Sequence, residues 1–266
     1  MVLFDYSREP RSDIAFVDMK SFYASCECIA LGLDPLKTSL CVMSRIENSA
    51  GLILAATPLF KKNFGSQNVS RSYNLPFDVH TRKFNYAAAR KQGLPITADY
   101  VRFIEDAAQK TLLVPPRMNY YIQKNMEIQK IFQDFAAPDD IFPYSIDEGF
   151  LDLTSSINYF IPDQTLDRRT KLDLLAARIQ QAIWKKTGIY ASIGLCNAKP
   201  LLAKLALDIE AKHTKKMRVN WSYEDVPSKV WTIPTITDFW GIGHRTATRL
   251  KKLGIHSIYD LAHFNP

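Results

Sequence analysis

Three acidic residues stand in apolar surroundings, and they constrain the fold more than any other feature of the sequence. Asp18 ends the apolar run 14–17, which is typical of a buried strand. Asp147 and Glu148 lie inside the segment 144–154, which we also predict to be strand-like. A carboxylate beside buried apolar residues is costly unless a cation neutralises it. The fold must therefore bring positive charge to these positions.

A pair of divalent ions is one source of that charge. Mg²⁺ binds a few carboxylates together with water and substrate phosphates, and two ions about 3.5–4 Å apart can stabilise both oxygens of a phosphoryl transfer. One acid from an early strand and two adjacent acids from a mid-chain hairpin suit such a site. The alternative is that Asp147 and Glu148 simply form a hairpin turn, and the spacing alone leaves both interpretations open.

Lysines near two predicted helices could complement the acids. Lys61 and Lys62 follow a predicted strand, and Lys199 and Lys204 flank the apolar start of a helix. Folded onto one cleft, these side chains would bind a nucleotide triphosphate as point charges. The alternative is that they are solvated lysines on exposed helix faces.

A glycine turn near the end of the sequence is followed by a basic helix. The turn is Gly241-Ile242-Gly243, and the residues after it include Arg245 and Thr246. Open backbone amides at the positive end of a helix dipole bind phosphate without reading bases. The pattern is typical of a helix-hairpin-helix, and we expect Gly241, Gly243, Arg245 and Thr246 to contact DNA. A plain glycine turn between two packed helices is the alternative.

The composition is that of a folded protein with a polyanionic partner. The 266 residues suggest about two domains, and 47% apolar with 23% charged residues excludes a disordered or fibrous chain. The net charge is +7, and residues 199–266 carry 11 Lys and Arg against 6 Asp and Glu. The cysteines lack metal-site spacing and are expected to be reduced; they are Cys26, Cys28, Cys41 and Cys196. Without an apolar leader or a run of about 20 apolar residues, we expect a cytoplasmic protein with no membrane contact.

Strands and helices interleave along the chain, so the predicted class is α/β or α+β. A polar lead-in occupies residues 1–13, and short helices and turns follow residue 230. Gly65 is expected to end a short helix, and Ser21 could cap the helix that follows it. We predict strands over 14–18, 40–43, 52–56, 144–154 and 189–195, and helices over 22–33, 119–135, 167–187 and 198–212.

Four motifs in the right order resemble those of the Y-family translesion DNA polymerases, in particular the bacterial UmuC/ImpB/MucB branch. Residues 16–27 resemble the first motif of that family, and residues 144–154 resemble its Y-S-I-D-E-x-F-L-D motif. Residues 192–206 resemble the third, and the turn at Gly241 stands where the family carries its thumb hairpin. The four motifs cover nearly the whole chain, which makes the resemblance more specific than any single motif.

The resemblance implies an α+β fold: a polymerase palm with a mixed or antiparallel sheet, small fingers, and a helical thumb with a helix-hairpin-helix. The palm would comprise residues 1–23 and 86–209, the fingers 24–85 and an incomplete thumb 210–266. Asp18, Asp147 and Glu148 would be the catalytic acids and would bind two Mg²⁺ ions, with the carbonyl of Met19 as a further ligand.

The resemblance also implies a nucleotide site. Phe22 and Tyr23 would lie under the incoming nucleotide, and the ring of Tyr23 would be the steric gate that excludes a ribose 2′-OH. Lys62 and Lys204 would hold the triphosphate. The implied activity is error-prone, template-directed DNA synthesis past lesions, in which a dNTP is joined to a primer 3′-OH on primer–template DNA. A sliding clamp or a recombinase filament is the implied protein partner, and the bacterial nucleoid is the implied location.

The sequence departs from the family pattern at several points. Lys20 replaces an Asp or Asn of many relatives, Pro58-Leu59 stands where some branches carry a triphosphate-binding Tyr, and residues 196–200 contain about one extra residue. Relatives continue into a little-finger domain, whereas this sequence ends at Pro266. We therefore expect the little finger to be absent and DNA binding to be weak. A catalytically silent remnant that binds only DNA or a partner, and another two-metal nucleotidyl transferase or cyclase, are the alternatives.

Overall fold

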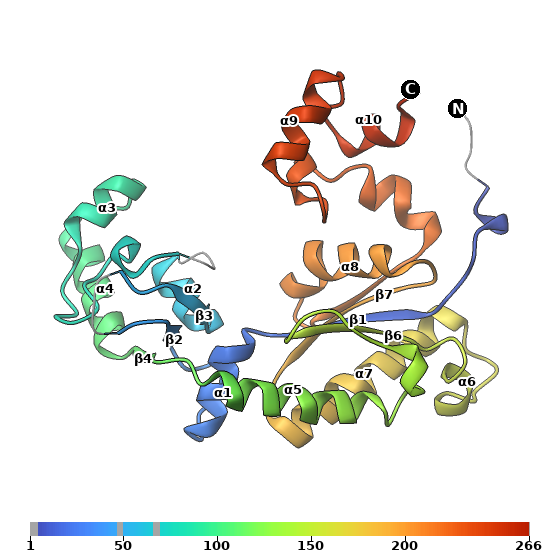
Figure 1. The fold of residues 1–266 in the computed structure, drawn as a ribbon, viewed down its shortest axis with the longest axis horizontal. Helices are drawn as coiled ribbons and strands as arrows, with labels where there is room; N and C mark the ends of the chain where they lie inside the picture. The colour runs from blue at the N-terminus through green and yellow to red at the C-terminus, as the bar shows by residue number, and fades with distance from the viewer. Residues whose placement is uncertain (1–4, 47–49, 66–69, 266) are drawn as a thin grey trace. The chain divides into compact units, whose positions relative to one another are not determined.

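The computed structural model describes residues 5–46, 50–65 and 70–265. The chain forms two compact units (Figure 1). Unit 1 consists of residues 1–19, 128–185 and 190–266, and unit 2 consists of residues 20–127 and 186–189. The start of the predicted lead-in, residues 1–4, and the last residue lie outside the described residues, as do short stretches of the predicted fingers. The division of the chain into palm, fingers and thumb stays a prediction.

Unit 1 is built on a five-stranded mixed sheet with the strand order β5-β6-β1-β7-β8. The central strand β1 is antiparallel to both of its neighbours, and β8 runs parallel to β7. The apolar residues of β1 and β7 are buried, as their near-continuous hydrophobic runs predict. The strands are β1 (Ile14–Met19), β5 (Ile141–Pro143), β6 (Glu148–Asp152), β7 (Ala191–Cys196) and β8 (Arg218–Trp221).

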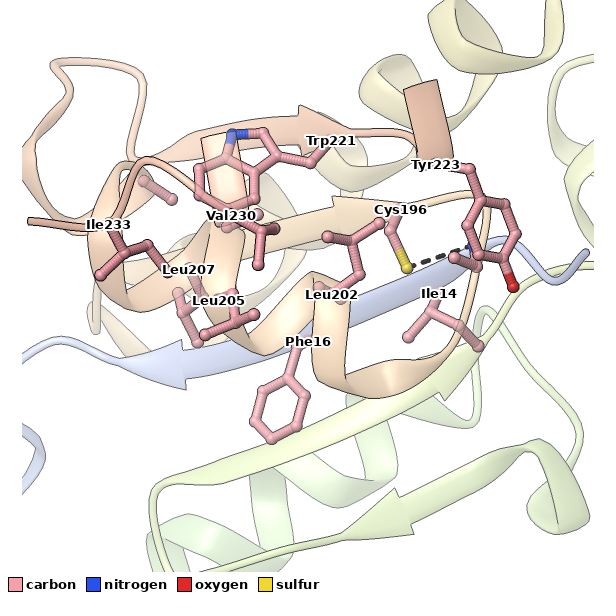
Figure 2. Packing of buried hydrophobic residues seen from close by; sticks show 14 of the residues in the cluster. Ile14, Phe16, Cys196, Leu202, Leu205, Leu207, Trp221, Tyr223, Val230 and Ile233 are labelled. Carbon is pink, nitrogen blue, oxygen red and sulfur yellow. Dashed lines mark hydrogen bonds between the residues drawn. The ribbon is translucent and has the colours of Figure 1, made fainter. Parts of the chain in front are cut away.

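Helix α8 (Pro200–Ile209) lies on one face of this sheet, and α7 (Arg168–Thr187) lies on the other (Figure 1). A Cβ atom added at Gly194 of β7 would be 2.0 Å from the carbonyl oxygen of Ala203 and 2.5 Å from the amide nitrogen of Leu207. Only glycine permits so close an approach of the α8 backbone to the sheet. Figure 2 shows the core between α8 and the sheet, which includes Ile14, Phe16, Leu202, Leu205, Trp221 and Val230.

The same core extends to the C-terminal helices of unit 1. Ile242 of the glycine turn and Ile258 are buried in the cluster that contains α8. The hydroxyl of Ser257 accepts a hydrogen bond from the Asp260 amide, and the Asp260 carboxylate accepts one from the Ser257 amide. These reciprocal bonds form a capping box. Unit 1 also contains the helices α6 (Ile157–Phe160), α9 (His244–Lys252) and α10 (Ile258–His263).

Unit 2 contains a three-stranded sheet with the order β3-β2-β4, in which β3 is antiparallel and β4 parallel to β2. Thr57 is fully buried, and its hydroxyl accepts hydrogen bonds from the amides of Leu40 and Phe60, so it caps α2 and ties that helix to β2. The elements are β2 (Leu40–Met43), β3 (Ile53–Ala56), β4 (Leu112–Val114), α1 (Phe22–Ala30), α2 (Pro58–Phe64), α3 (Tyr86–Gln92), α4 (Ala98–Gln109) and the start of α5 (Met118–Phe132).

The α+β class and most of the predicted elements are confirmed. Gly65 ends α2 with φ 61°, and Gly188 follows α7 with φ 73°. The four cysteines are free and buried. Among the described residues, no helix is both long and apolar enough to cross a membrane.

Three local predictions are wrong. The segment 144–154 is not one strand, because β5 ends at Pro143 and the carbonyl of Glu148 accepts hydrogen bonds from the amides of Tyr144 and Ser145, which closes a turn. The predicted helix 198–212 ends at Ile209 and continues as a 3₁₀ turn over Ala211–His213. Ser21 stands at the N-cap of α1, but its backbone is left-handed and its side chain makes no capping bond.

Candidate active site

Two of the predicted acids are direct neighbours across adjacent strands. Asp18 of β1 lies opposite Glu148 of β6 and, on its other side, opposite Ser192 of β7. Directly opposed residues of an antiparallel pair point to the same face of the sheet. The Asp18 and Glu148 side chains are 14% and 15% exposed. The fold therefore places two carboxylates and a hydroxyl together on the face covered by α8.

Two lysines neutralise this acid pair. Lys204 of α8 holds its Nζ 2.7 Å from Glu148 Oε1, and Lys212 holds its Nζ 2.9 Å from Asp18 Oδ2. Asp208 joins the two lysines, because its carboxylate lies 3.1 Å from Lys204 Nζ and 2.9 Å from Lys212 Nζ. Lys204 and Asp208 lie one helical turn apart on α8, and Lys212 follows in the 3₁₀ turn after that helix. The buried acids are thus held by cations, as their apolar surroundings require.

The electrostatics of the pair follow from burial and proximity. Burial raises the pKa of Asp18 to about 7, the ammonium of Lys212 opposes this rise, and the neighbouring Glu148 adds to it. Burial disfavours the charged form of Lys212, but the carboxylates of Asp18 and Asp208 outweigh it and raise the pKa of that lysine. The site therefore favours a bound cation beside Asp18.

Asp147 and Ser192 complete the surroundings of the pair. The amide of Met19 donates a hydrogen bond of 2.9 Å to the carbonyl of Asp147, while the Asp147 carboxylate accepts one of 2.8 Å from the Ser145 hydroxyl. Ser192 Oγ is fully buried and has no hydrogen-bond partner among the described residues. Within the described part of the chain, no three His, Cys, Asp or Glu side chains are grouped as metal ligands. The structure thus brings Asp18, Glu148 and Lys204 together but does not gather the Asp147 side chain with them.

The other predicted nucleotide contacts belong to unit 2. Phe22 and Tyr23 are the first two residues of α1, with ring centroids 5.9 Å apart. Phe22 is buried, Tyr23 is half-buried, and Lys62 is exposed in the last turn of α2.

The glycine turn has the open backbone that its sequence predicts. Gly241 has φ 89°, a left-handed conformation that favours glycine, and Gly243 is the N-cap of α9. A Cβ added at either glycine would meet nothing within 4 Å. Arg245 and Thr246 are exposed in the first turn of α9. The turn and the helix that follows are therefore open to a ligand.

We term Asp18, Glu148, Lys204, Asp208 and Lys212 the acid–lysine cluster. Two of its members were not predicted from the sequence. Asp208 and Lys212 lie four and eight residues after Lys204, and this spacing on a predicted helix could have identified them. The orphaned hydroxyl of Ser192 carried no such signal, because it depends on the register between β1 and β7.

Comparison with known proteins identifies the family. The profile of the impB/mucB/samB family matches residues 78–208, and that of the IMS family HHH motif matches residues 223–255. The DNA repair protein homolog YozK of Bacillus subtilis (strain 168) is 33% identical over 143 residues, which are 54% of this chain and 98% of YozK. The chain belongs to the impB/mucB/samB family. The predicted hairpin and the predicted family are both confirmed.

Longer relatives and solved structures extend the similarity over almost the whole chain. UvrX of Bacillus subtilis (strain 168), whose name links it to repair of UV damage, is 34% identical over 262 residues, which are 98% of this chain and 52% of UvrX. A solved Y-family DNA polymerase chimera superimposes with a TM-score of 0.65 at 22% identity, over 95% of this chain and 61% of the chimera. This impB/mucB/samB family member thus has the Y-family polymerase fold and spans about half the length of UvrX.

Proposed function

We propose that this chain is the catalytic core of an error-prone, template-directed DNA polymerase that adds dNTPs to a primer 3′-OH past lesions. The observation that carries the proposal is the cross-strand pair Asp18–Glu148, held beside Lys204 on the sheet of a polymerase-like fold. Family membership supports the same chemistry. The substrates would be dNTPs and primer–template DNA. The proposed location is the bacterial nucleoid, and the proposed protein partner is a sliding clamp or a recombinase filament.

The acid pair has the chemistry of a Mg²⁺ site. Its donors are carboxylate oxygens, which Mg²⁺ prefers, and an ammonium group already lies 2.9 Å from Asp18. We infer that Asp18, Asp147, Glu148 and the Met19 carbonyl would hold two Mg²⁺ ions, which would supply charge stabilisation during phosphoryl transfer. Glu148 would be the acid nearest the primer 3′ end. Lys212 would leave Asp18 when the metal binds.

The nucleotide would be bound by lysines and aromatic rings. Lys204 is 6% exposed at its side chain and reaches Glu148 from α8, so it can deliver a point charge to phosphate oxygens beside the acids. Lys62 is the second proposed triphosphate contact, and Phe22 and Tyr23 would lie against the nucleotide, with Tyr23 as the steric gate. Tyr23→Ala should then admit ribonucleotides, and an unchanged ratio of dNTP to rNTP incorporation would refute the gate.

The glycine turn would bind the DNA backbone. Its amides are open, and Arg245 and Thr246 are exposed beside them. Helix N-termini and basic side chains of this kind contact phosphates without reading sequence. Binding should therefore weaken steeply as salt concentration rises.

Primer extension with Mg²⁺ tests the proposed activity. We expect the parent chain to extend a primer and Asp147→Ala to lose that activity, because the acid would no longer bind metal. Asp139→Ala is the matched control, since Asp139 is an exposed acid in another part of unit 1. A parent no more active than Asp147→Ala would overturn the polymerase proposal.

A DNA-binding protein without turnover is the second candidate. Two observations favour it. Lys204 and Lys212 form ion pairs with Glu148 and Asp18, and the Asp147 carboxylate accepts a hydrogen bond from Ser145. A gel shift on primer–template DNA separates the two candidates. Binding that dNTP strengthens would support the polymerase, whereas binding that dNTP leaves unchanged, with no extension, would support the silent protein.

A further inference from the structure

The ring of Tyr23 is stacked on a second tyrosine that none of the motifs includes. Tyr121 of α5 lies with its ring centroid 4.4 Å from that of Tyr23, and the two ring planes are 13° apart. Tyr121 is fully buried. Both tyrosines belong to unit 2. The ring proposed as the steric gate therefore rests on a buried aromatic surface.

A buried glutamate fixes the far end of Tyr121. The Tyr121 hydroxyl donates a hydrogen bond of 2.8 Å to Glu27 Oε1. Glu27 lies four residues after Tyr23 on α1, so the two side chains lie on the same side of that helix. The ring of Tyr121 is thus held at one side by stacking and at its hydroxyl by a hydrogen bond.

Arg117 completes the arrangement. Its Nε donates to both Glu27 oxygens at 3.0 and 3.1 Å, and its Nη2 donates to Glu27 Oε2 at 2.7 Å. Arg117 is four residues before Tyr121, and the Tyr121 amide donates to the Arg117 carbonyl. A bidentate pair between arginine and carboxylate fixes both distance and orientation. Residues 23 and 27 on α1, with 117 and 121 at the start of α5, form a closed set of contacts that we term the gate support.

A purely structural contact between the two helices would not need a buried charge. Glu27 is 6% exposed at its side chain, and an apolar pair of similar volume usually stabilises a core as well as a buried ion pair does. What the polar contacts add is orientation, because directional bonds hold the Tyr121 ring in one position. A fixed Tyr121 ring in turn restricts the position of the Tyr23 ring that is stacked on it.

We propose that Tyr121, oriented by Glu27 and Arg117, is a positioning residue for sugar selection: it holds the Tyr23 ring where it excludes a ribose 2′-OH. This inference rests on the proposed role of Tyr23. A steric gate works only while its ring cannot turn aside. Tyr121 acts through Tyr23 and contacts neither sugar nor phosphate.

Single-nucleotide incorporation measures the effect. The catalytic efficiency kcat/KM is determined for dATP and for ATP opposite a template thymine. Stacked aromatic pairs contribute enough that losing one should lower the dATP/ATP ratio by about 2-fold to 10-fold. We expect Tyr121→Leu to do so by raising the efficiency with ATP, while the efficiency with dATP changes less than about 2-fold. Tyr121→Phe keeps the ring and loses only the bond to Glu27, so its effect should be smaller, and Glu27→Gln should resemble it.

Matched variants separate positioning from loss of structure. Tyr120→Leu removes the neighbouring tyrosine, which lies under the Arg117 guanidinium at 4.6 Å, and should leave the ratio unchanged. A structural defect would lower both efficiencies together and leave their ratio unchanged, which would overturn the proposal. In the double variant Tyr23→Ala/Tyr121→Leu, the second change should have no further effect on the ratio, because the supported ring is already gone.

The outcomes also separate this inference from the proposed function. If Tyr23→Ala leaves the ratio unchanged, the gate itself is wrong. If Tyr23→Ala lowers the ratio and neither Tyr121 variant does, only the positioning role is wrong. Equilibrium binding of dATP and ATP to the protein with primer–template DNA and Ca²⁺ measures the sugar preference of binding alone, without turnover. Tyr23→Ala should bind dATP with a smaller preference over ATP than the parent does. If Tyr121→Leu keeps the full preference of the parent in this binding assay, the positioning role is wrong.

Discussion

Glu27 in unit 2 and Asp18 in unit 1 are both buried carboxylates, but their partners differ in kind. Glu27 uses both oxygens in bonds to the rigid guanidinium of Arg117 and to the Tyr121 hydroxyl. Asp18 is paired with Lys212, a flexible point charge with a side chain that is 30% exposed. Both oxygens of Glu27 accept directional bonds, whereas Asp18 is paired with one partly exposed ammonium group.

The difference separates an acid that is fixed by its partners from one that we propose as a metal ligand. In the gate support both Glu27 oxygens accept hydrogen bonds. Beside Asp18, Ser192 Oγ is buried without a described partner, and burial raises the pKa of Asp18 to about 7. Buried groups with shifted pKa values or unsatisfied hydrogen bonds are common at functional sites, where they lower the stability of the fold. The same change, from acid to amide, should therefore have opposite consequences in the two units.

The largest expected effect is on activity at Asp18. If Asp18 binds Mg²⁺ as proposed, Asp18→Asn should lower primer extension by about 10³-fold, because a neutral amide is a much poorer ligand than a carboxylate. Its free energy of unfolding without Mg²⁺ should change by less than about 1 kcal/mol, since burial already disfavours the charged form and Lys212 keeps Asp208 as a partner. Urea unfolding beside primer extension measures both. If Asp18→Asn loses much stability but keeps its activity, Asp18 is a structural acid and the proposed difference from Glu27 is wrong.

Glu27→Gln should show the other half of the comparison. The amide cannot accept both arginine bonds, so we expect the free energy of unfolding to fall by about 2 kcal/mol, within the range for hydrogen bonds to charged groups. The exposure of the Arg117 side chain, at 49%, keeps the loss from being larger. Equilibrium urea unfolding at neutral pH measures it. If Glu27→Gln and Asp18→Asn have the same free energy of unfolding, the partners of the two carboxylates contribute equally to stability.

Lys212→Met should produce a smaller effect that metal can reverse. Removing the ammonium leaves Asp18 without its 2.9 Å partner, and we expect a loss of about 1 kcal/mol in the free energy of unfolding, because Lys212 is partly exposed. Mg²⁺ should then raise Tm more in this variant than in the parent, since no lysine competes for the carboxylate. Thermal unfolding with and without Mg²⁺ measures both values. An equal Mg²⁺ shift in the two proteins would show that Lys212 does not occupy the cation position.

The acids were predictable from sequence because their chemistry conflicts with their local surroundings. Asp18 ends an apolar strand, and a carboxylate in that position by itself predicts a cationic partner. The register that sets Asp18 opposite Glu148 and Ser192 was not predictable, since it depends on pairing between strands far apart in sequence. The turn at 144–147 was missed because alternating residues there resemble a strand, whereas two amides bond to the Glu148 carbonyl.

The gate support illustrates the other limit of sequence reasoning. Glu27 reads as one polar residue in a short apolar helix, and Tyr121 as one apolar position of an amphipathic helix. Neither pattern tells which tyrosine stacks on Tyr23 or which arginine meets the carboxylate. Those contacts arise only when α1 packs against the start of α5 within unit 2.

The smallest expected effect concerns Ser192, whose buried hydroxyl has no hydrogen-bond partner among the residues that the structure describes. A buried hydroxyl with no partner carries a desolvation cost, so Ser192→Ala should leave the free energy of unfolding unchanged or raise it by up to about 1 kcal/mol. Thr57 of unit 2 is the matched control, since it is equally buried but accepts two amide hydrogen bonds. Thr57→Val should therefore destabilise the protein by about 1 kcal/mol or more. If urea unfolding shows that Ser192→Ala destabilises the chain as much as Thr57→Val does, the Ser192 hydroxyl has a partner such as an ordered water. The acid–lysine cluster would then be as well satisfied as the gate support.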